Sequence, residues 1–131
     1  MKFTRKEIQF LQTQEAARIA TSHDDIPHVK PVSFVFHCNC VFIATDYDTR
    51  TFKNAKINSK ASIVIDIYQS GGHKAVCFQG DIDILEDGDE FEKIYRIFHK
   101  KFKWVRNDPW KPGEAPFLKI IPKNKVIWGI D

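Results

Sequence analysis

The chain has 131 residues and a mass of 15.2 kDa, which is the size of one domain. Its 43% hydrophobic and 28% charged residues are close to globular averages and exclude wholesale disorder. Its 20 Lys and Arg against 17 Asp and Glu give a net charge of only +3, too small to indicate nucleic-acid binding by itself. No apolar run approaches the roughly 20 residues of a membrane-spanning helix. We therefore expect a single domain, 1–131, with neither a nucleic-acid nor a membrane partner.

The N-terminal segment is charged and amphipathic and has no uninterrupted apolar stretch of the kind found in signal peptides. This favours a cytoplasmic location, where the odd set of Cys38, Cys40 and Cys77 is expected to be reduced. His37, Cys38 and Cys40 resemble half a zinc site, but no second pair completes four ligands. We therefore expect no structural metal.

Capping and turn signals define the first elements. Thr4 and Glu7 have the spacing of a capping box, which predicts a first helix that ends near Gln14. Alternation over residues 17–21 predicts a strand, which breaks at the turn-rich segment 23–27.

A second strand is predicted over residues 28–36, with Pro31 inside it. Because proline donates no ladder hydrogen bond, it indicates an edge strand or a place where the ladder opens. The turn 37–40 then predicts a hairpin to a third strand over 41–44.

The remaining elements alternate between strands and helices. First comes a short helix, capped by residues 46–49 and running to Lys56, followed by strands over 61–68 and 76–85. A capping box at 87–90 then begins an amphipathic helix that carries Phe91, Ile94, Tyr95, Phe98 and Phe102. A loop over 107–116 leads to the last strands, over 117–121 and 126–128. Tight turns between consecutive strands indicate an antiparallel meander of six or seven strands in a barrel or sandwich, a mainly β fold with short flanking helices.

Two further clusters carry candidate chemistry. His23, Asp24, Asp25 and His28 offer metal or proton-transfer groups, although a solvated turn is the favoured interpretation. Residues 45–54 place three hydroxyls, two cations and an amide where a strand ends and a helix begins. Free N–H groups and the macrodipole favour an anion there, and the alternative is a solvated capping turn.

That segment belongs to a longer ordered series of motifs. In order these are Ala17-Arg18-Ile19-Ala20-Thr21, Pro27-His28-Val29-x-Pro31-Val32-x-Phe34, Phe42-Ile43-Ala44-Thr45, Lys53-Asn54 and Ala61-Ser62-Ile63-Val64-Ile65-Asp66, followed by the Gly80 strand and Asp108-Pro109-Trp110-Lys111-x-Gly113-Glu114-Ala115-Pro116 to Trp128-Gly129. Over nearly the whole chain the series resembles the pyridoxamine 5′-phosphate oxidase-related FMN-binding split-barrel family.

The resemblance implies a homodimer of six-stranded antiparallel split β-barrels of the FMN-binding type, with FMN held at the subunit interface. The residues it assigns to the cofactor are Arg18, Thr49, Arg50, Lys53 and Asn54 around the phosphate, the Pro31, Val32 and Ser33 backbone along the ring edge, Thr45 near the ribityl chain, and Gln79 with Trp104, Trp110 or Trp128 approaching the ring from the partner subunit. Lys53 and Arg18 are expected to flank the phosphate.

The sequence departs from vitamin-B6 oxidases in three ways. The Arg- and His-bearing segment that holds pyridoxamine phosphate is missing, the usual C-terminal extension is missing, and Thr51 and Phe52 stand where relatives often carry another basic residue. Vitamin-B6 oxidation is therefore not expected. Relatives use FMN, a deazaflavin coenzyme or haem.

The leading hypothesis is a flavin-dependent oxidoreductase with a small-molecule substrate and a reduced nicotinamide or other electron donor, in which the cofactor carries the chemistry and no protein acid or base is identified. The alternatives are a non-catalytic flavin-binding or storage protein and a deazaflavin-dependent reductase. A polyglutamyl coenzyme tail would need an extended basic groove. Its candidate residues are Lys100, Lys101, Lys103, Arg106, Lys111 and Lys119, for which a solubilising surface is the favoured interpretation.

Overall fold

The computed structural model describes residues 1–131 as a mainly β structure with four short helices. The helices are α1 (Arg5–Thr13), α2 (Arg50–Ile57), α3 (Gly88–Lys101) and α4 (Lys103–Asn107), and the strands are β1 (Ala16–His23), β2 (Ile26–His37), β3 (Cys40–Ala44), β4 (Lys60–Ile67), β5 (Lys74–Leu85), β6 (Phe117–Pro122) and β7 (Val126–Trp128). No helix is long and apolar enough to cross a membrane.

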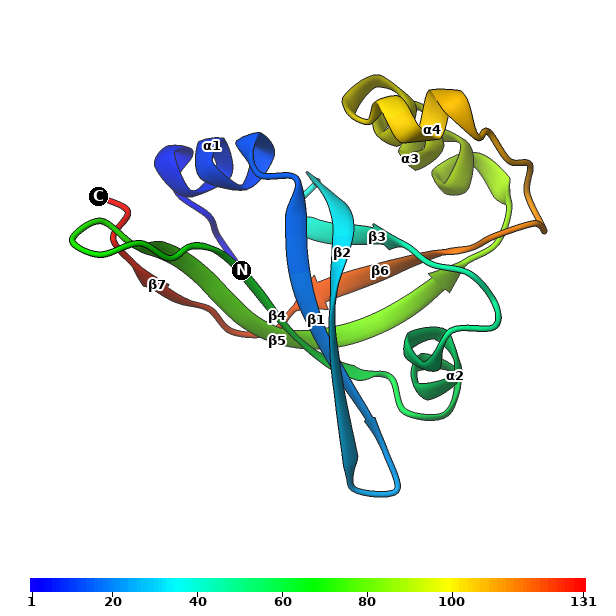
Figure 1. The fold of residues 1–131 in the computed structure, drawn as a ribbon, viewed down its shortest axis with the longest axis horizontal. Coiled ribbons are helices and arrows are strands. Elements are labelled where there is room, and N and C mark those ends of the chain that lie inside the picture. The colour runs from blue at the N-terminus through cyan, green and yellow to red at the C-terminus, as the bar shows by residue number, and fades with distance from the viewer.

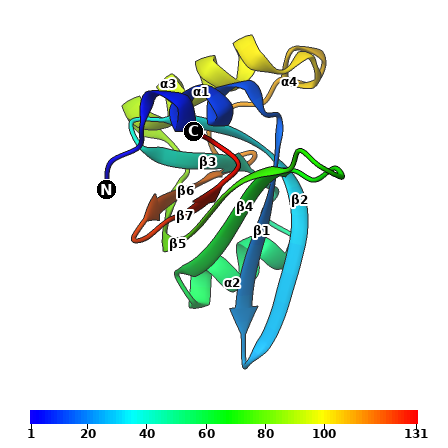
Figure 2. The same cartoon turned by 90° about the vertical axis from the view of Figure 1, so that its left-hand side faces the viewer.

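Six antiparallel strands close into a barrel. The sheet order is β4-β1-β2-β3-β6-β5-β7, and a further β4–β5 pairing closes it. Helices α1, α3 and α4 lie at one end, α2 lies towards the other, and the β1–β2 hairpin extends beyond the barrel (Figures 1 and 2). The sequence-based expectation of a six-stranded antiparallel split barrel is thus confirmed.

The strand order corrects the expected meander. β6 and β7 follow each other along the chain but do not pair; β6 pairs with residues 80–85 of β5, and β7 pairs with residues 75–77 of it. The reason is the length of β5, whose 12 residues have room for two partners on one edge and β4 on the other.

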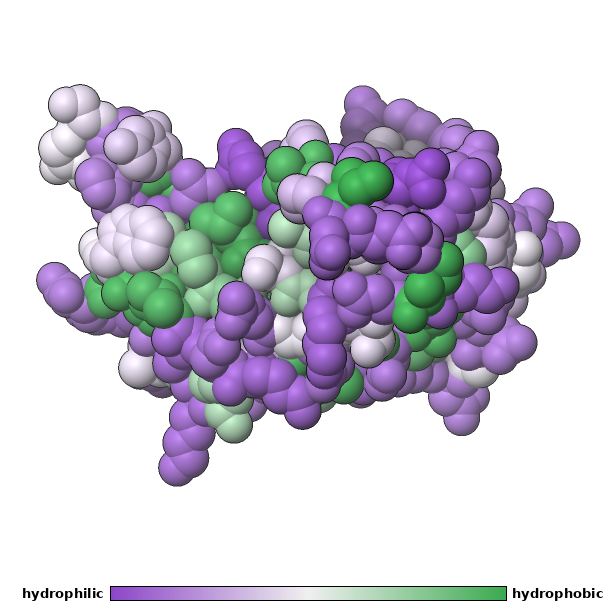
Figure 3. Space-filling view, turned by 90° about the horizontal axis from the view of Figure 1, so that it is seen from below, coloured by the Kyte–Doolittle hydropathy of each residue, from purple (hydrophilic) through white to green (hydrophobic).

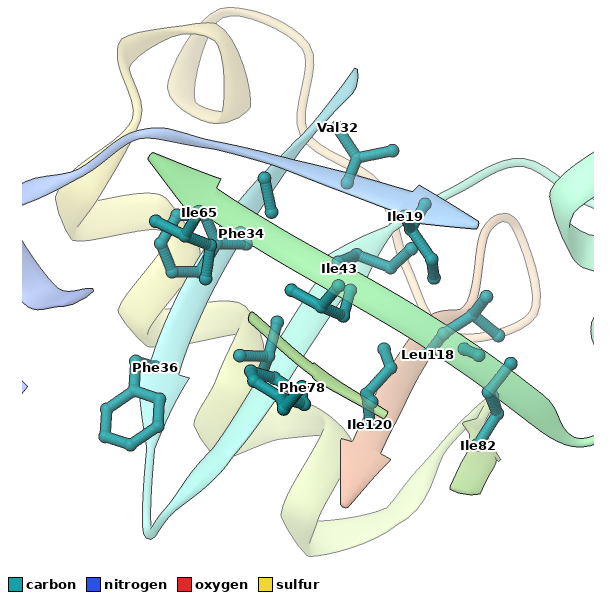
Figure 4. Packing of buried hydrophobic residues seen from close by; sticks show 14 of the residues in the cluster. Ile19, Val32, Phe34, Phe36, Ile43, Ile65, Phe78, Ile82, Leu118 and Ile120 are labelled. Carbon is teal, nitrogen blue, oxygen red and sulfur yellow. The ribbon is translucent and has the colours of Figure 1, made fainter. Parts of the chain in front are cut away.

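Inward-facing residues from alternate strand positions fill the barrel. Ile19, Phe34, Ile43, Ile65 and Phe78 are each no more than 3% exposed and point towards one another (Figure 4). A second cluster lies outside the barrel, where α3 packs over the outer face of β2, β3 and β6. Its members are Val35, Cys40, Phe42, Phe91, Ile94, Phe98, Phe102, Val105 and Phe117. The C-terminal part of β2 is therefore buried on both faces, by Phe34 inside and Val35 outside.

One helix cap is confirmed and the other is wrong. At α1, Thr4 N donates to the Glu7 side chain and Glu7 N donates to Thr4 Oγ1, at 3.1 and 3.2 Å, as the capping box predicts. At α3, Asp87 makes no side-chain cap hydrogen bond. Gly88 begins that helix with φ +93°, in the left-handed region that favours glycine.

Two boundaries also differ from the sequence-based expectation. The turn predicted over 23–27 contains only Asp24 and Asp25, with φ 52° and 62°, because Pro27 already pairs with Ser22. Left-handed φ at both turn residues is the geometry of a tight two-residue hairpin, and it confirms the turn interpretation of this cluster. Helix α4 was not predicted: it lies between the expected helix, which carries Phe102, and the expected loop over 107–116, and its five residues are too few to show a helical period.

We predict that Gly80→Ala lowers the free energy of unfolding by about 1–3 kcal/mol, the usual cost of overpacking. A Cβ at Gly80 would lie 2.3 Å from the Ile121 carbonyl oxygen, and both are backbone-anchored. Denaturant unfolding measures the effect. Gly72→Ala is the control, because its Cβ would meet only Gln69 Nε2 at 3.6 Å. Equal stability of the two variants would contradict the close approach of β5 and β6.

Candidate cofactor site beside the open edge of β2

The partner of β2 changes along its length. Residues 26–33 pair with β1 on one edge, whereas pairing with β3 begins only at Phe34. The other edge of β2 therefore carries no strand from Ile26 to Ser33. Pro31 lies in this part of β2, so the expected open ladder is confirmed. Pro31 is exposed and Ser33 half-buried, while the Val32 side chain faces the core.

The chain from β3 into α2 forms a tight hydroxyl-bearing turn. Thr49, the N-cap of α2, accepts a hydrogen bond from Phe52 N at 3.1 Å and donates to the Asp46 carbonyl oxygen at 3.0 Å. Its hydroxyl also lies 2.7 Å from that of Thr45, just beyond β3. Thr is a strong N-cap residue, so the sequence itself fixes this turn. The turn holds Arg50 at the first position of the helix.

Arg50 lines a hollow of about 340 Å³ between α2 and the β1–β2 hairpin. The other lining residues are His23, Ile26, Pro27, His28 and Asn54. Arg50 is exposed and forms no ion pair, whereas His23 lies 3.2 Å from Asp24. One unpaired guanidinium and two imidazoles around a hollow suit an anion. From the sequence, His23 and His28 are candidates for metal binding or proton transfer, with a solvated turn favoured. Their position next to α2 depends on the register of the hairpin and could not be predicted from the sequence.

The rest of α2 divides into structural and solvent-facing positions. Asn54 is 2% exposed, and its Nδ2 donates to Thr21 Oγ1 at 3.1 Å, which fastens α2 to β1. Lys53 is exposed on the helix surface. Thr51 is fully buried, and its hydroxyl has no hydrogen-bond partner.

Arg18 and Gln79 lie elsewhere, on the outer face of the sheet. They line a mostly apolar hollow of about 610 Å³ whose walls include Val29, Val64 and Val126. Arg18 Nη1 is 2.5 Å from Asp66 Oδ1, and the Gln79 amide is hydrogen-bonded to Asn124 at 3.1 Å. Arg18 thus lines a different hollow from Arg50.

The outer face around this hollow carries exposed apolar side chains. Val29 is 67% exposed, Val126 59% and Trp128 42%. Figure 3 shows apolar side chains gathered on the side of the molecule where β4, β5 and β7 lie. These side chains are left exposed on that side by the rest of the chain. Trp128 lies on the same side because it pairs with Ala75 of β5.

Trp110 lies at the opposite end, under α3 and α4. Its ring is stacked on Trp104 with centroids 5.8 Å apart and an interplanar angle of 9°. Both rings line a hollow of about 260 Å³ together with Thr45 and Asp46. The Trp110 indole N–H is buried without a partner. The sequence offered three tryptophans as candidates to approach the flavin ring. Within one chain, Trp104 and Trp110 are the two that lie next to Thr45.

The three cysteines are separate thiols in the structure: Cys38 is exposed, Cys40 buried and Cys77 half-buried. Burial raises the pKa of both Cys40 and Cys77, which keeps these thiols protonated. No group of three or more His, Cys, Asp or Glu side chains is arranged to hold a metal ion.

A closed antiparallel barrel of six strands with an open edge on β2 defines the split-barrel class. The sequence profile of the pyridoxamine 5′-phosphate oxidase family matches residues 3–128, so the chain belongs to that family. No curated protein matches the sequence significantly.

Solved structures share the fold at low sequence identity. HutZ, the haem storage protein of Vibrio cholerae, superposes with a TM-score of 0.81 at 15% identity, covering 99% of this chain and 96% of HutZ. An FAD-binding protein from Mesorhizobium loti gives 0.71 at 17% identity, with 89% and 85% covered. An FAD-binding protein from Mycobacterium smegmatis gives 0.69 at 17% identity, with 95% of each chain covered. Identities this low show the fold alone.

We predict that Thr51→Val raises the free energy of unfolding by about 1 kcal/mol or more, because it removes a buried hydroxyl that has no partner while keeping the side-chain shape. Thermal or denaturant unfolding of the protein without ligand measures the change. Thr45→Val is the matched control and should lower stability, since the Thr45 hydroxyl is hydrogen-bonded to Thr49. A destabilised Thr51→Val protein would show that the hydroxyl is satisfied in solution.

Proposed function

We propose that this protein binds FMN beside the open edge of β2 and acts as a flavin-dependent oxidoreductase on a small molecule, with a reduced nicotinamide or another donor supplying electrons. The observation that carries the proposal is the conjunction of a strand edge without a partner and an unpaired Arg50 next to it, at the start of α2. Membership of the family and the FAD-binding relatives support a flavin as the cofactor.

The residues present fit the phosphate end of the flavin. A phosphate dianion needs cations and N–H or O–H donors. Arg50 and Lys53 are exposed cations on α2. The Thr45 and Thr49 hydroxyls are already hydrogen-bonded within the turn, so their part is to hold the start of α2 in shape. Asn54 is already bonded to Thr21, so its part is to hold α2 in place.

The open edge of β2 fits the ring end. The pyrimidine edge of a flavin carries alternating donors and acceptors, and a strand edge without a partner presents the same alternation of N–H and C=O groups. When bound, FMN would supply hydride and electron transfer. The Pro31 to Ser33 backbone would orient the ring, and the Ser33 N–H would stabilise negative charge on the reduced ring, since proline has no N–H.

We also propose that the protein is a homodimer that pairs through the outer face of β1, β4, β5 and β7 and the adjoining part of β2 that carries Val29. Val29, Val126 and Trp128 are exposed on that face and suit a hydrophobic interface. Pairing there would bring Arg18, Gln79 and Trp128 of one subunit towards the open β2 edge of the other.

Light scattering tests the assembly: the expected mass is twice 15.2 kDa. Val126→Glu should shift it towards the monomer by placing a charge on the face, whereas Lys103→Glu, far from the face, should not. A stable wild-type monomer at micromolar concentration contradicts the dimer.

The absorption spectrum of the purified and reconstituted protein tests the cofactor. Flavin, deazaflavin and haem have distinct spectra, and a flavin spectrum is expected. A haem spectrum, a deazaflavin spectrum or no binding of FMN in a titration contradicts the proposal. Steady-state turnover with a reduced nicotinamide then separates an oxidoreductase from a flavin-storage protein.

We predict that Arg50→Ala and Lys53→Ala each weaken FMN binding about ten- to a hundredfold, the cost of one charge-assisted hydrogen bond, while riboflavin, which has no phosphate, binds as before. Calorimetric titration of FMN, FAD and riboflavin into each variant measures this. Lys56→Ala, on the same helix one turn further on, is the matched control. Equal losses for FMN and riboflavin would overturn the phosphate assignment.

A further inference from the structure

A second basic hollow lies at the other end of β2, between α1 and α3. It has a volume of about 880 Å³ and is lined by Gln12 of α1, Val35, Phe36 and His37 of β2, and Lys93, Arg96, Ile97, Lys100 and Lys101 of α3. Both helices lie over the same end of the sheet (Figures 1 and 2). Ligand pockets typically have about 300–1,000 Å³, so this hollow has room for a small molecule.

One of these cations, Lys101, has a structural role. Lys101 Nζ donates to the carbonyl oxygens of Gln14 and Phe34 at 2.5 and 3.0 Å and lies 4.5 Å from the centroid of the Phe34 ring. Burial lowers the pKa of Lys101 to about 8. Lys101 therefore fastens the C-terminal end of α3 to β2 and to the residue after α1, which holds the two walls of the hollow at a fixed separation.

The other three cations have no partner. Lys93, Arg96 and Lys100 are spaced i, i+3 and i+7, so they lie on one helix face and span about 10 Å at 1.5 Å per residue. All three are exposed, and none forms an ion pair or a side-chain hydrogen bond. Asp89 and Glu92 stand one turn before Lys93 and Arg96, yet neither pairs with them, and no carboxylate lines the hollow.

A merely solubilising surface would not need this arrangement. Like charges three and four residues apart repel each other and destabilise a helix. The macrodipole favours cations only in the last turn, which accounts for Lys100 but not for Lys93 in the first half of α3. Elsewhere on this protein some exposed lysines pair with a carboxylate, as Lys60 and Lys123 do with Asp81, and others, such as Lys74 and Lys103, form no ion pair and line none of the hollows described above. The α3 cations are thus concentrated on a hollow and left without counter-charges.

We propose that the hollow between α1 and α3 binds a small anion that carries two or more phosphate or carboxylate groups. Lys93, Arg96 and Lys100 hold its charged groups, and His37 faces them from the end of β2. The cation row spans about 10 Å, a length that suits a ligand with more than one anionic group. The inference does not depend on the flavin proposal, since the two sites share no residue.

The shape of the site favours a compact ligand over a nucleic acid. Bases bound by single-strand-binding proteins stack on exposed aromatic rings, whereas Phe36 in this hollow is only 7% exposed. The net charge of +3 is also modest for a nucleic-acid-binding protein.

The test is calorimetric titration of the wild-type protein with inorganic tripolyphosphate and with citrate at low salt. We expect one site per chain and an affinity that falls as salt is added. The triple variant Lys93→Ala, Arg96→Ala, Lys100→Ala should bind at least about a hundredfold more weakly, because several charge-assisted bonds are lost. The control triple variant Lys56→Ala, Lys103→Ala, Lys111→Ala loses the same net charge and should stay within about threefold of wild type.

Circular dichroism establishes that both variants are folded, and FMN titration should give the same affinity for the α3 variant and for wild type. Four results would overturn the proposal: no binding of either probe by wild type, equal weakening in the two triple variants, displacement of tripolyphosphate by FMN, or duplex DNA binding that is tighter than tripolyphosphate and is abolished in the α3 variant. The last result would assign the same cations to nucleic acid.

Discussion

The change of partner along β2 is the constraint on which the rest of the candidate site depends. Up to Ser33 the strand pairs with β1, and from Phe34 onwards it pairs with β3 and is buried on both faces. The first part therefore presents unpaired backbone groups, and the second part holds it rigidly on the barrel. A proline is tolerated at position 31 because no strand needs its N–H on that side. The same change of partner leaves room for α2, which brings Arg50 beside the open edge.

The cations of this protein fall into groups with different surroundings. Lys60 and Lys123 are neutralised by Asp81, and Arg18 by Asp66. Arg50 on α2 and the row on α3 have no counter-charge, and each lines a hollow. Because unpaired cations close to one another raise the energy of the folded state, their placement at hollows at opposite ends of β2 is an electrostatic indication of ligand binding.

Short-range sequence patterns predicted the individual helices and strands, but they could not predict which distant strands pair with one another. The capping box at Thr4, the hairpin at Cys38 and Asn39, and the helical spacing from Phe91 to Phe98 are short-range patterns, and the structure confirms all three. The pairing of β6 and β7 with the same strand is a long-range choice that no local pattern carries. The same limit applies to the site. The ordered motifs suggested one group of cofactor residues, but only the folded chain separates Arg18 on the outer face from Arg50 at α2 and joins His23 and His28 to the latter.

Hydrogen–deuterium exchange with and without FMN tests the central claim, because strand-edge amides without a partner exchange readily and are protected when a ligand covers them. The account predicts slower exchange on adding FMN in peptides that cover Ile26 to Ser33 and Thr45 to Asn54, with α1 and α3 unchanged. Protection confined to α3, or none at the β2 edge while FMN is bound, would contradict it.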